Sequence, residues 1–160
     1  PPRSTQSRSS AASDVYKRQI SNTSTNQQQT IGKPVSIKGI GLHTGAEVTM
    51  KLYPAKVDYG IKFIRKDIKD NNLIEALWSN VTNTKLSTTI SNQNGASVST
   101  IEHLMSALSG LHIDNIKIEI DGPEVPIMDG SSIKFVDLID QTSTQSLNKR
   151  RKILKVKKNI

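Results

Sequence analysis

The sequence has no cysteine, and Phe, Tyr and Trp together make up only 4% of its 160 residues. Without cysteine there is no disulfide framework and no thiolate metal site, and the scarcity of aromatic residues leaves Ile, Leu and Val to build the core. No apolar run approaches the roughly 18 residues of a membrane-spanning helix. The first residues also lack the apolar middle of a secretory signal. We therefore expect a cytoplasmic protein without a transmembrane segment.

The positive charge of the chain is confined to its two ends. The whole sequence carries a net charge of +8, of which residues 1–19 contribute +3 and residues 148–160 contribute +7. Residues 20–147 therefore carry a net −2, so we expect no basic groove on the folded surface and no nucleic-acid partner. The alternative hypothesis is a non-enzymatic binding module that uses its basic ends to hold nucleic acid or anionic lipid.

Composition divides the chain into three parts. Residues 1–28 are rich in Ser, Thr, Gln and Asn, which predicts a disordered tail, and their beginning resembles a translated linker rather than a native start. Residues 29–147 have the apolar periodicity of one folded domain. Residues 148–160 are interpreted as a linker and the first strand of a truncated second domain, with the strand itself at 152–158.

Apolar residues in the folded part first alternate at strand spacing. The predicted strands are 30–40 and 46–53, which form a hairpin across a Gly-rich turn, followed by 60–65, 73–81, 86–91 and 115–121, with a turn at 92–95. Residues 142–148 are predicted to be a polar linker. Strands that precede two late helices indicate an α+β fold, in which one sheet carries both helices on one face.

Two helices are expected in the later part of the domain. The first begins at Ser99, which has capping-box spacing to Glu102, and it ends at Gly110. The second follows Asp129 or Ser131, either of which can cap it.

Glu102 and His103 are the main candidates for chemistry because they are adjacent at the start of a helix. An imidazole in this position can bind zinc. The preceding carboxylate lies about 100° around the helix axis, where it can take a proton from the attacking water. The alternative is an independent structural domain in which Glu102 is only a helix cap and His103 a partly buried histidine.

Three further residues are weaker candidates. His43 lies in the Gly-rich turn, His112 follows the end of the first helix, and Asp129 precedes the second. Each also has a structural explanation, as a turn residue, a helix C-terminal charge or a cap. A catalytic zinc needs three protein ligands and an open position. His103 would therefore need further ligands from His43, from His112, from scattered carboxylates or from sequence outside this chain.

Four stretches occur here in one order and register: IKGIGLHTG (37–45), TKLSTTIS (84–91), STIEHLMSALSGL (99–111) and IDGPEVPIMDGSS (120–132). Together they resemble the UDP-3-O-acyl-N-acetylglucosamine deacetylase family, zinc enzymes of lipid A biosynthesis. The resemblance runs from about residue 28 to about residue 156. It implies the first of two similar α+β domains, whose helix layers face each other with the active site between them.

The resemblance also implies roles for individual residues. His103 matches the zinc ligand of the family's first domain, Glu102 matches its general base, and Leu86 and Ser87 match positions that line the substrate pocket. The implied cofactor is one Zn²⁺, and its other ligands, a His and an Asp, belong to the second domain. We therefore expect a UDP-linked acylated glucosamine as substrate and the missing second domain of the same polypeptide as partner. The complete protein is expected to be a monomer, and this chain alone is expected to be inactive.

Overall fold

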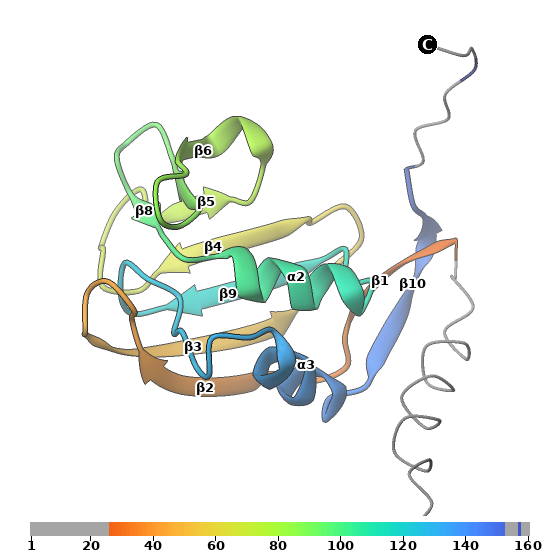
Figure 1. The fold of residues 1–160 in the computed structure, drawn as a ribbon. Coiled ribbons are helices and arrows are strands. Elements are labelled where there is room, and N and C mark those ends of the chain that lie inside the picture. The colour runs from red at the N-terminus through yellow and green to blue at the C-terminus, as the bar shows by residue number, and fades with distance from the viewer. Residues whose placement is uncertain (1–25, 153–156, 158–160) are drawn as a thin grey trace, which may run out of the picture.

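The computed structural model describes residues 26–152 and residue 157 (Figure 1). Its main sheet has five strands in the order β2-β3-β9-β4-β5. The strands are β2 (Val35–Ile40), β3 (Glu47–Pro54), β4 (Ile61–Arg65), β5 (Leu73–Glu75) and β9 (Ile116–Ile120). Neighbouring strands are antiparallel except for β4 and β9, which are parallel. The predicted hairpin is confirmed for residues 35–40, which form β2 and pair with β3. The predicted strand 30–40 is not continuous, because residues 30 and 31 pair with residues 144 and 145 instead.

Helices α2 (Glu102–Gly110) and α3 (Ile133–Asp140) lie over one face of the main sheet (Figure 1). Every second residue of β9 is buried, and the residues between them are half-buried. A sheet with this alternation has one apolar face, which both helices cover. The core therefore confirms the predicted α+β fold. It contains Val48, Met50, Leu52, Phe63, Ile116, Ile118 and Ile120 from the sheet, and Leu104, Leu108, Phe135 and Ile139 from the helices.

Two smaller sheets accompany the main one. A three-stranded sheet follows β5 and consists of β6 (Val81–Asn83), β7 (Thr89–Ser91) and β8 (Ser97–Val98), preceded by a 3-10 turn, η1 (Trp78–Asn80). The continuous strand predicted over 73–81 is therefore wrong, because η1 interrupts it. A two-stranded sheet pairs β1 (Gln27–Ile31) with β10 (Thr144–Arg150).

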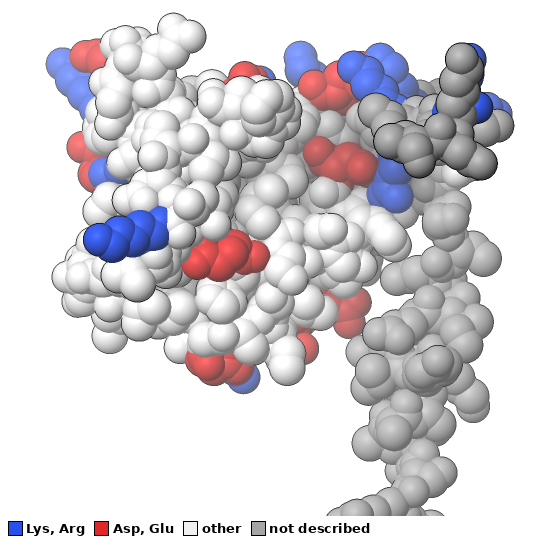
Figure 2. All heavy atoms as spheres, turned by 45° about the horizontal axis from the view of Figure 1, so that its top comes forward, with Lys and Arg blue, Asp and Glu red and all other residues white. Residues whose placement is uncertain are grey.

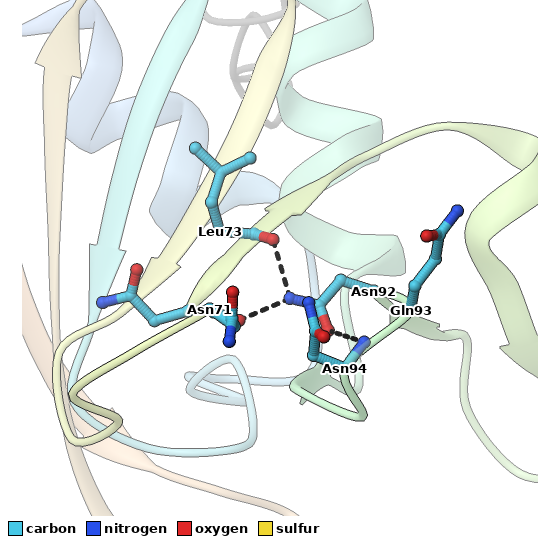
Figure 3. A pocket seen from close by; sticks show the side chains of 6 residues that line it. Asn71, Leu73, Asn92, Gln93 and Asn94 are labelled. Atoms are coloured by element: carbon cyan, nitrogen blue, oxygen red, sulfur yellow. Dashed lines mark hydrogen bonds between the residues drawn. The ribbon is translucent and has the colours of Figure 1, made fainter.

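The three-stranded sheet is attached to the main sheet by side chains that bind backbone groups. Asn92 Nδ2 donates to the carbonyl oxygens of Asn71 at 2.6 Å and Leu73 at 2.9 Å (Figure 3). The buried Arg65, at the end of β4, donates to the carbonyl oxygen of Ser97 in β8. The predicted turn at 92–95 is confirmed, since the Gly95 amide donates to the Asn92 carbonyl at 3.2 Å.

The polar linker predicted over 142–148 is wrong, because β10 pairs antiparallel with β1 there. Strand β1 itself begins at Gln27, inside the tail expected to be disordered. Both errors have one cause: these strands are held by polar contacts that apolar periodicity does not reveal. The buried Gln28 donates to Asp58 Oδ1 and accepts from Asn115 Nδ2, each at 2.9 Å.

The strand predicted at 152–158 lies largely outside the described residues. Within the part of the chain that is described, no helix has the length and apolar character needed to cross a membrane.

Candidate functional site

The first turn of α2 is formed differently from the prediction. The capping box is not formed, because α2 has Ile101 as its N-cap and no side-chain cap. Ser99 pairs instead with the loop after β9: its amide and its hydroxyl donate to the Pro123 carbonyl at 2.9 and 3.3 Å, and its carbonyl accepts from the Val125 amide at 3.0 Å. The Glu102 carboxylate is therefore not used as a helix cap.

Glu102 and His103 are both half-buried at the start of α2. Glu102 Oε2 accepts a hydrogen bond from the Thr88 amide at 3.0 Å. Among the described residues, no hydrogen bond reaches Glu102 Oε1 or the His103 ring. One carboxylate oxygen and the imidazole can therefore take a ligand without first breaking a protein contact.

Leu86 and Ser87 lie in the loop between β6 and β7. Leu86 is 83% exposed and has a φ of +67°, a backbone conformation that is rare for a residue with a branched side chain. Strained backbone and exposed apolar side chains both concentrate at sites of ligand contact. The loop is joined to α2 through Thr88, whose amide binds Glu102 and whose carbonyl accepts from the Ile101 amide at 3.4 Å.

A buried carboxylate that the sequence analysis missed, Glu124, joins the same region to the Gly-rich turn. Glu124 Oε1 accepts from the His43 amide at 3.0 Å and from Thr100 Oγ1 at 2.8 Å. Glu124 Oε2 accepts from the amide and from the hydroxyl of Thr44, each at 2.9 Å. Burial raises the pKa of Glu124, but the donors from His43, Thr44 and Thr100 outweigh it and bring the pKa below its ordinary value.

The Gly-rich turn packs directly against the Glu124 carboxylate. A Cβ atom on Gly41 would lie 2.5 Å from Glu124 Oε2 and 2.3 Å from Thr44 Oγ1. A Cβ atom on Gly39 would lie 2.8 Å from the Cβ atom of Pro126. The predicted tight turn is confirmed by the bond from the Gly45 amide to the Gly41 carbonyl at 3.0 Å. Positions 39 and 41 need glycine because the neighbouring Pro126, Glu124 and Thr44 side chains leave no room for a Cβ atom.

The weaker candidates do not gather with His103 into one metal site. The side chains of His43 and His112 are exposed, the second of them beyond the end of α2. Asp129 is exposed and accepts from the amide and hydroxyl of Ser131 at 3.0 and 2.8 Å, which lowers the pKa of this carboxyl. Within the described residues, no three His, Asp or Glu side chains are placed to hold a metal ion. The described residues therefore do not by themselves form a three-ligand metal site.

The four sequence segments meet at one end of the main sheet (Figure 1). Segments 37–45 and 99–111 are joined to segment 120–132 through Glu124, and segment 84–91 is joined to segment 99–111 through Glu102. The fold and the site thus define a class of protein: an α+β domain that presents a carboxylate and an imidazole side by side at the start of one helix.

Comparison with known proteins identifies the family within this class. Residues 28–160 match the family model LpxC, UDP-3-O-acyl N-acetylglycosamine deacetylase, and the chain belongs to this family. Three relatives carry the name UDP-3-O-acyl-N-acetylglucosamine deacetylase. They come from Syntrophotalea carbinolica (52% identical), Geobacter sp. strain M21 (53%) and Syntrophus aciditrophicus (43%). Each match covers 83% of this chain but only 42–43% of the relative, so the chain spans less than half of their length.

Proposed function

We propose that this chain is the first half of a zinc-dependent amidase that removes acetate from UDP-3-O-(3-hydroxyacyl)-N-acetylglucosamine in lipid A biosynthesis. The observation that carries the proposal is the Glu102–His103 pair, which is half-buried and lies where the four segments meet in a chain of this family. The names of the relatives supply the substrate class. The proposal keeps the cytoplasmic location expected from the sequence.

In this proposal His103 holds the zinc ion together with donors from a second domain of the same polypeptide. Support comes from the half-buried ring, which has no hydrogen-bond partner among the described residues. Bound zinc would supply Lewis acidity for the attack of water on the acetamide carbonyl.

Glu102 acts as the general base and takes the proton of the attacking water. The bond from the Thr88 amide to Oε2 fixes the orientation of the carboxylate, and Oε1 is left to accept the proton. Leu86 and Ser87 precede Thr88 directly, which supports their assignment to the wall of the substrate pocket. A further His of the second domain, separate from the zinc ligand, protonates the leaving amine or stabilises the oxyanion, so that acetate and the free amine result.

The test uses a joined polypeptide, in which residues 28–160 are followed by the part of the Geobacter sp. relative that lies beyond the matched segment. Glu102→Gln is expected to lower kcat by about 10²–10⁴-fold, as for other lost general bases, while zinc is retained. Glu47→Gln is the matched control, since Glu47 is an exposed carboxylate on β3. Near-normal turnover by Glu102→Gln with zinc bound would remove Glu102 from the mechanism.

The same proposal predicts that residues 1–160 alone have no deacetylase activity, because one imidazole does not hold catalytic zinc. Activity of the purified chain with stoichiometric zinc would contradict a site shared between two domains.

The alternative of a basic binding module relies on the two ends of the chain, which lie largely outside the described residues. On the face shown in Figure 2, the described residues form an extended area with few charges, and acidic and basic side chains are mixed toward its edges. Nucleic-acid binding by electrostatics requires clustered Lys and Arg side chains.

A further inference from the structure

Glu124 is the one buried carboxylate among the described residues, and the mechanism above does not use it. We propose that Glu124 is a positioning residue: its carboxylate holds Thr100 against the 41–45 turn and so fixes where α2 presents Glu102 and His103. The catalytic consequence rests on the proposed function. The positioning itself can be measured in this chain without any activity.

Thr100 is the strained residue at the entrance to α2. Its φ is +57°, and this left-handed conformation makes a β-branched residue a genuine outlier. Such a backbone persists only where its surroundings hold it in place. Here the Thr100 side chain is buried, and its hydroxyl donates to Glu124 Oε1 at 2.8 Å. A hydrogen bond to a buried ionised group is about twice as strong as a neutral one, so it is a suitable restraint.

Glu124 is held in turn by the Gly-rich turn on its other side. The amides of His43 and Thr44 and the hydroxyl of Thr44 all donate to it. Each carboxylate oxygen faces at least one backbone amide, which can only donate. A glutamine at this position would therefore turn its NH₂ group toward an N–H from which it cannot accept, whichever oxygen it replaces. The negative charge, and not only the size of the side chain, therefore joins the three segments.

The hydrogen bonds of Thr88 depend on the position of the first turn of α2. This amide donates to Glu102 Oε2, and the Thr88 carbonyl accepts from the Ile101 amide. Thr100 lies two residues before Glu102 in the chain. If Thr100 leaves its conformation, the first turn shifts and the bond from Thr88 to Glu102 is lost. Protection of the Thr88 amide from hydrogen exchange is thus a local measure of how Glu102 is positioned.

The experiment compares Glu124→Gln and Thr100→Val with the unmodified chain of residues 1–160. Thr100→Val keeps the size and branching of the side chain but removes the hydroxyl, so it tests the inference even if Glu124→Gln does not fold. Hydrogen exchange and NMR spectra are recorded for the Thr88 amide and the His103 ring. The Ile118 amide in the main sheet serves as the reference for global unfolding.

Both variants are expected to raise Thr88 exchange about tenfold more than Ile118 exchange, the effect of losing one charge-assisted hydrogen bond. They are also expected to shift the His103 ring signals. Asp121→Asn is the matched control: Asp121 accepts from the Thr49 amide at 2.7 Å next to the same loop but does not contact Thr100. The inference would be overturned if Glu124→Gln or Thr100→Val raised exchange of the Ile118 amide but left Thr88 exchange and the His103 signals unchanged. Glu124 would then be a purely structural residue.

In the joined polypeptide, Glu124→Gln is expected to lower kcat by up to about 100-fold through misplacement of Glu102 and His103, with KM unchanged, when zinc is supplied in excess so that the site stays occupied. A rise in KM of similar size with kcat unchanged would contradict a positioning role for Glu124. If the unmodified joined polypeptide does not deacetylate the substrate, the proposed function fails, but Thr88 exchange still decides whether Glu124 positions α2.

Discussion

At the residue scale, Glu124 shows how a single charge can organise distant parts of a chain. Its donors lie between 24 and 81 positions away in the sequence. No periodicity or spacing rule marks a buried carboxylate, and the only available signal was an acidic residue inside the otherwise apolar PEVPIM run at 123–128. Glu102 and His103 were found because they are adjacent at a predicted helix start and match family positions with known roles. Glu124 lies in the family-like stretch 120–132 as well, but only the three-dimensional contacts gave it a role.

Gly41→Ala is expected to destabilise the fold at this carboxylate. The new Cβ atom would lie within 2.5 Å of Glu124 Oε2 and of Thr44 Oγ1, so both groups would have to move and a buried hydrogen bond would be strained. We expect a loss of about 1–3 kcal/mol in the free energy of unfolding, measured by urea denaturation.

Gly110→Ala is the matched control for Gly41→Ala. Gly110 is the last residue of α2, and a Cβ atom there would meet nothing within 4 Å. Alanine is favoured over glycine in a helix, so this change is expected to be neutral or slightly stabilising. Equal stability of the two variants would show that the turn does not depend on close contact with Glu124.

At the element scale, the sequence predicted the elements that have a clear apolar period and missed those that lack one. Period-two alternation marked β3, β4 and β9 clearly, and 3.6-residue periodicity marked α2 and α3. The two-residue β8 and the turn η1 are too short to carry a periodic signal. The polar strands β1 and β10 are stabilised by pairing and by side-chain hydrogen bonds, which a pattern of apolar residues does not record.

Asn92→Ala is expected to loosen the three-stranded sheet. Asn92 Nδ2 binds two carbonyl groups next to and in β5, and Asn92 Oδ1 accepts from the amides of Asn94 and Ala96 (Figure 3). Loss of these bonds should cost about 1–3 kcal/mol. Asn92→Ala should raise the rate of amide hydrogen exchange in β7 more than in β9.

The matched control is Asn94→Ala, since the Asn94 side chain is exposed and makes no hydrogen bond among the described residues. If Asn92→Ala raised exchange in β9 as much as in β7, the attachment through Asn92 would not be local. Because Thr88 lies beside β7, the same loosening should reach the contact between Thr88 and Glu102.

At the scale of the whole molecule, the chain is a layered domain with a site at one end of its sheet. Several large apolar side chains remain exposed, among them Leu42, Trp78, Leu86 and Ile133, at 57%, 90%, 83% and 61%. Exposed apolar residues of this size are typical of surfaces that contact a ligand or another domain. Under the proposed function, these side chains are where we expect contact with the second domain and the acylated substrate.

The central claim is that His103 provides one of the protein ligands of a zinc ion shared with the rest of the polypeptide. The most direct measurement is the zinc content and zinc affinity of the joined polypeptide, with and without His103→Ala, alongside residues 1–160 alone. We predict one zinc ion per joined polypeptide, an affinity at least about 100-fold weaker in His103→Ala, because even second-shell changes cost 10–100-fold, and no stoichiometric zinc in the chain alone. Unchanged zinc affinity in a folded His103→Ala variant would contradict the account.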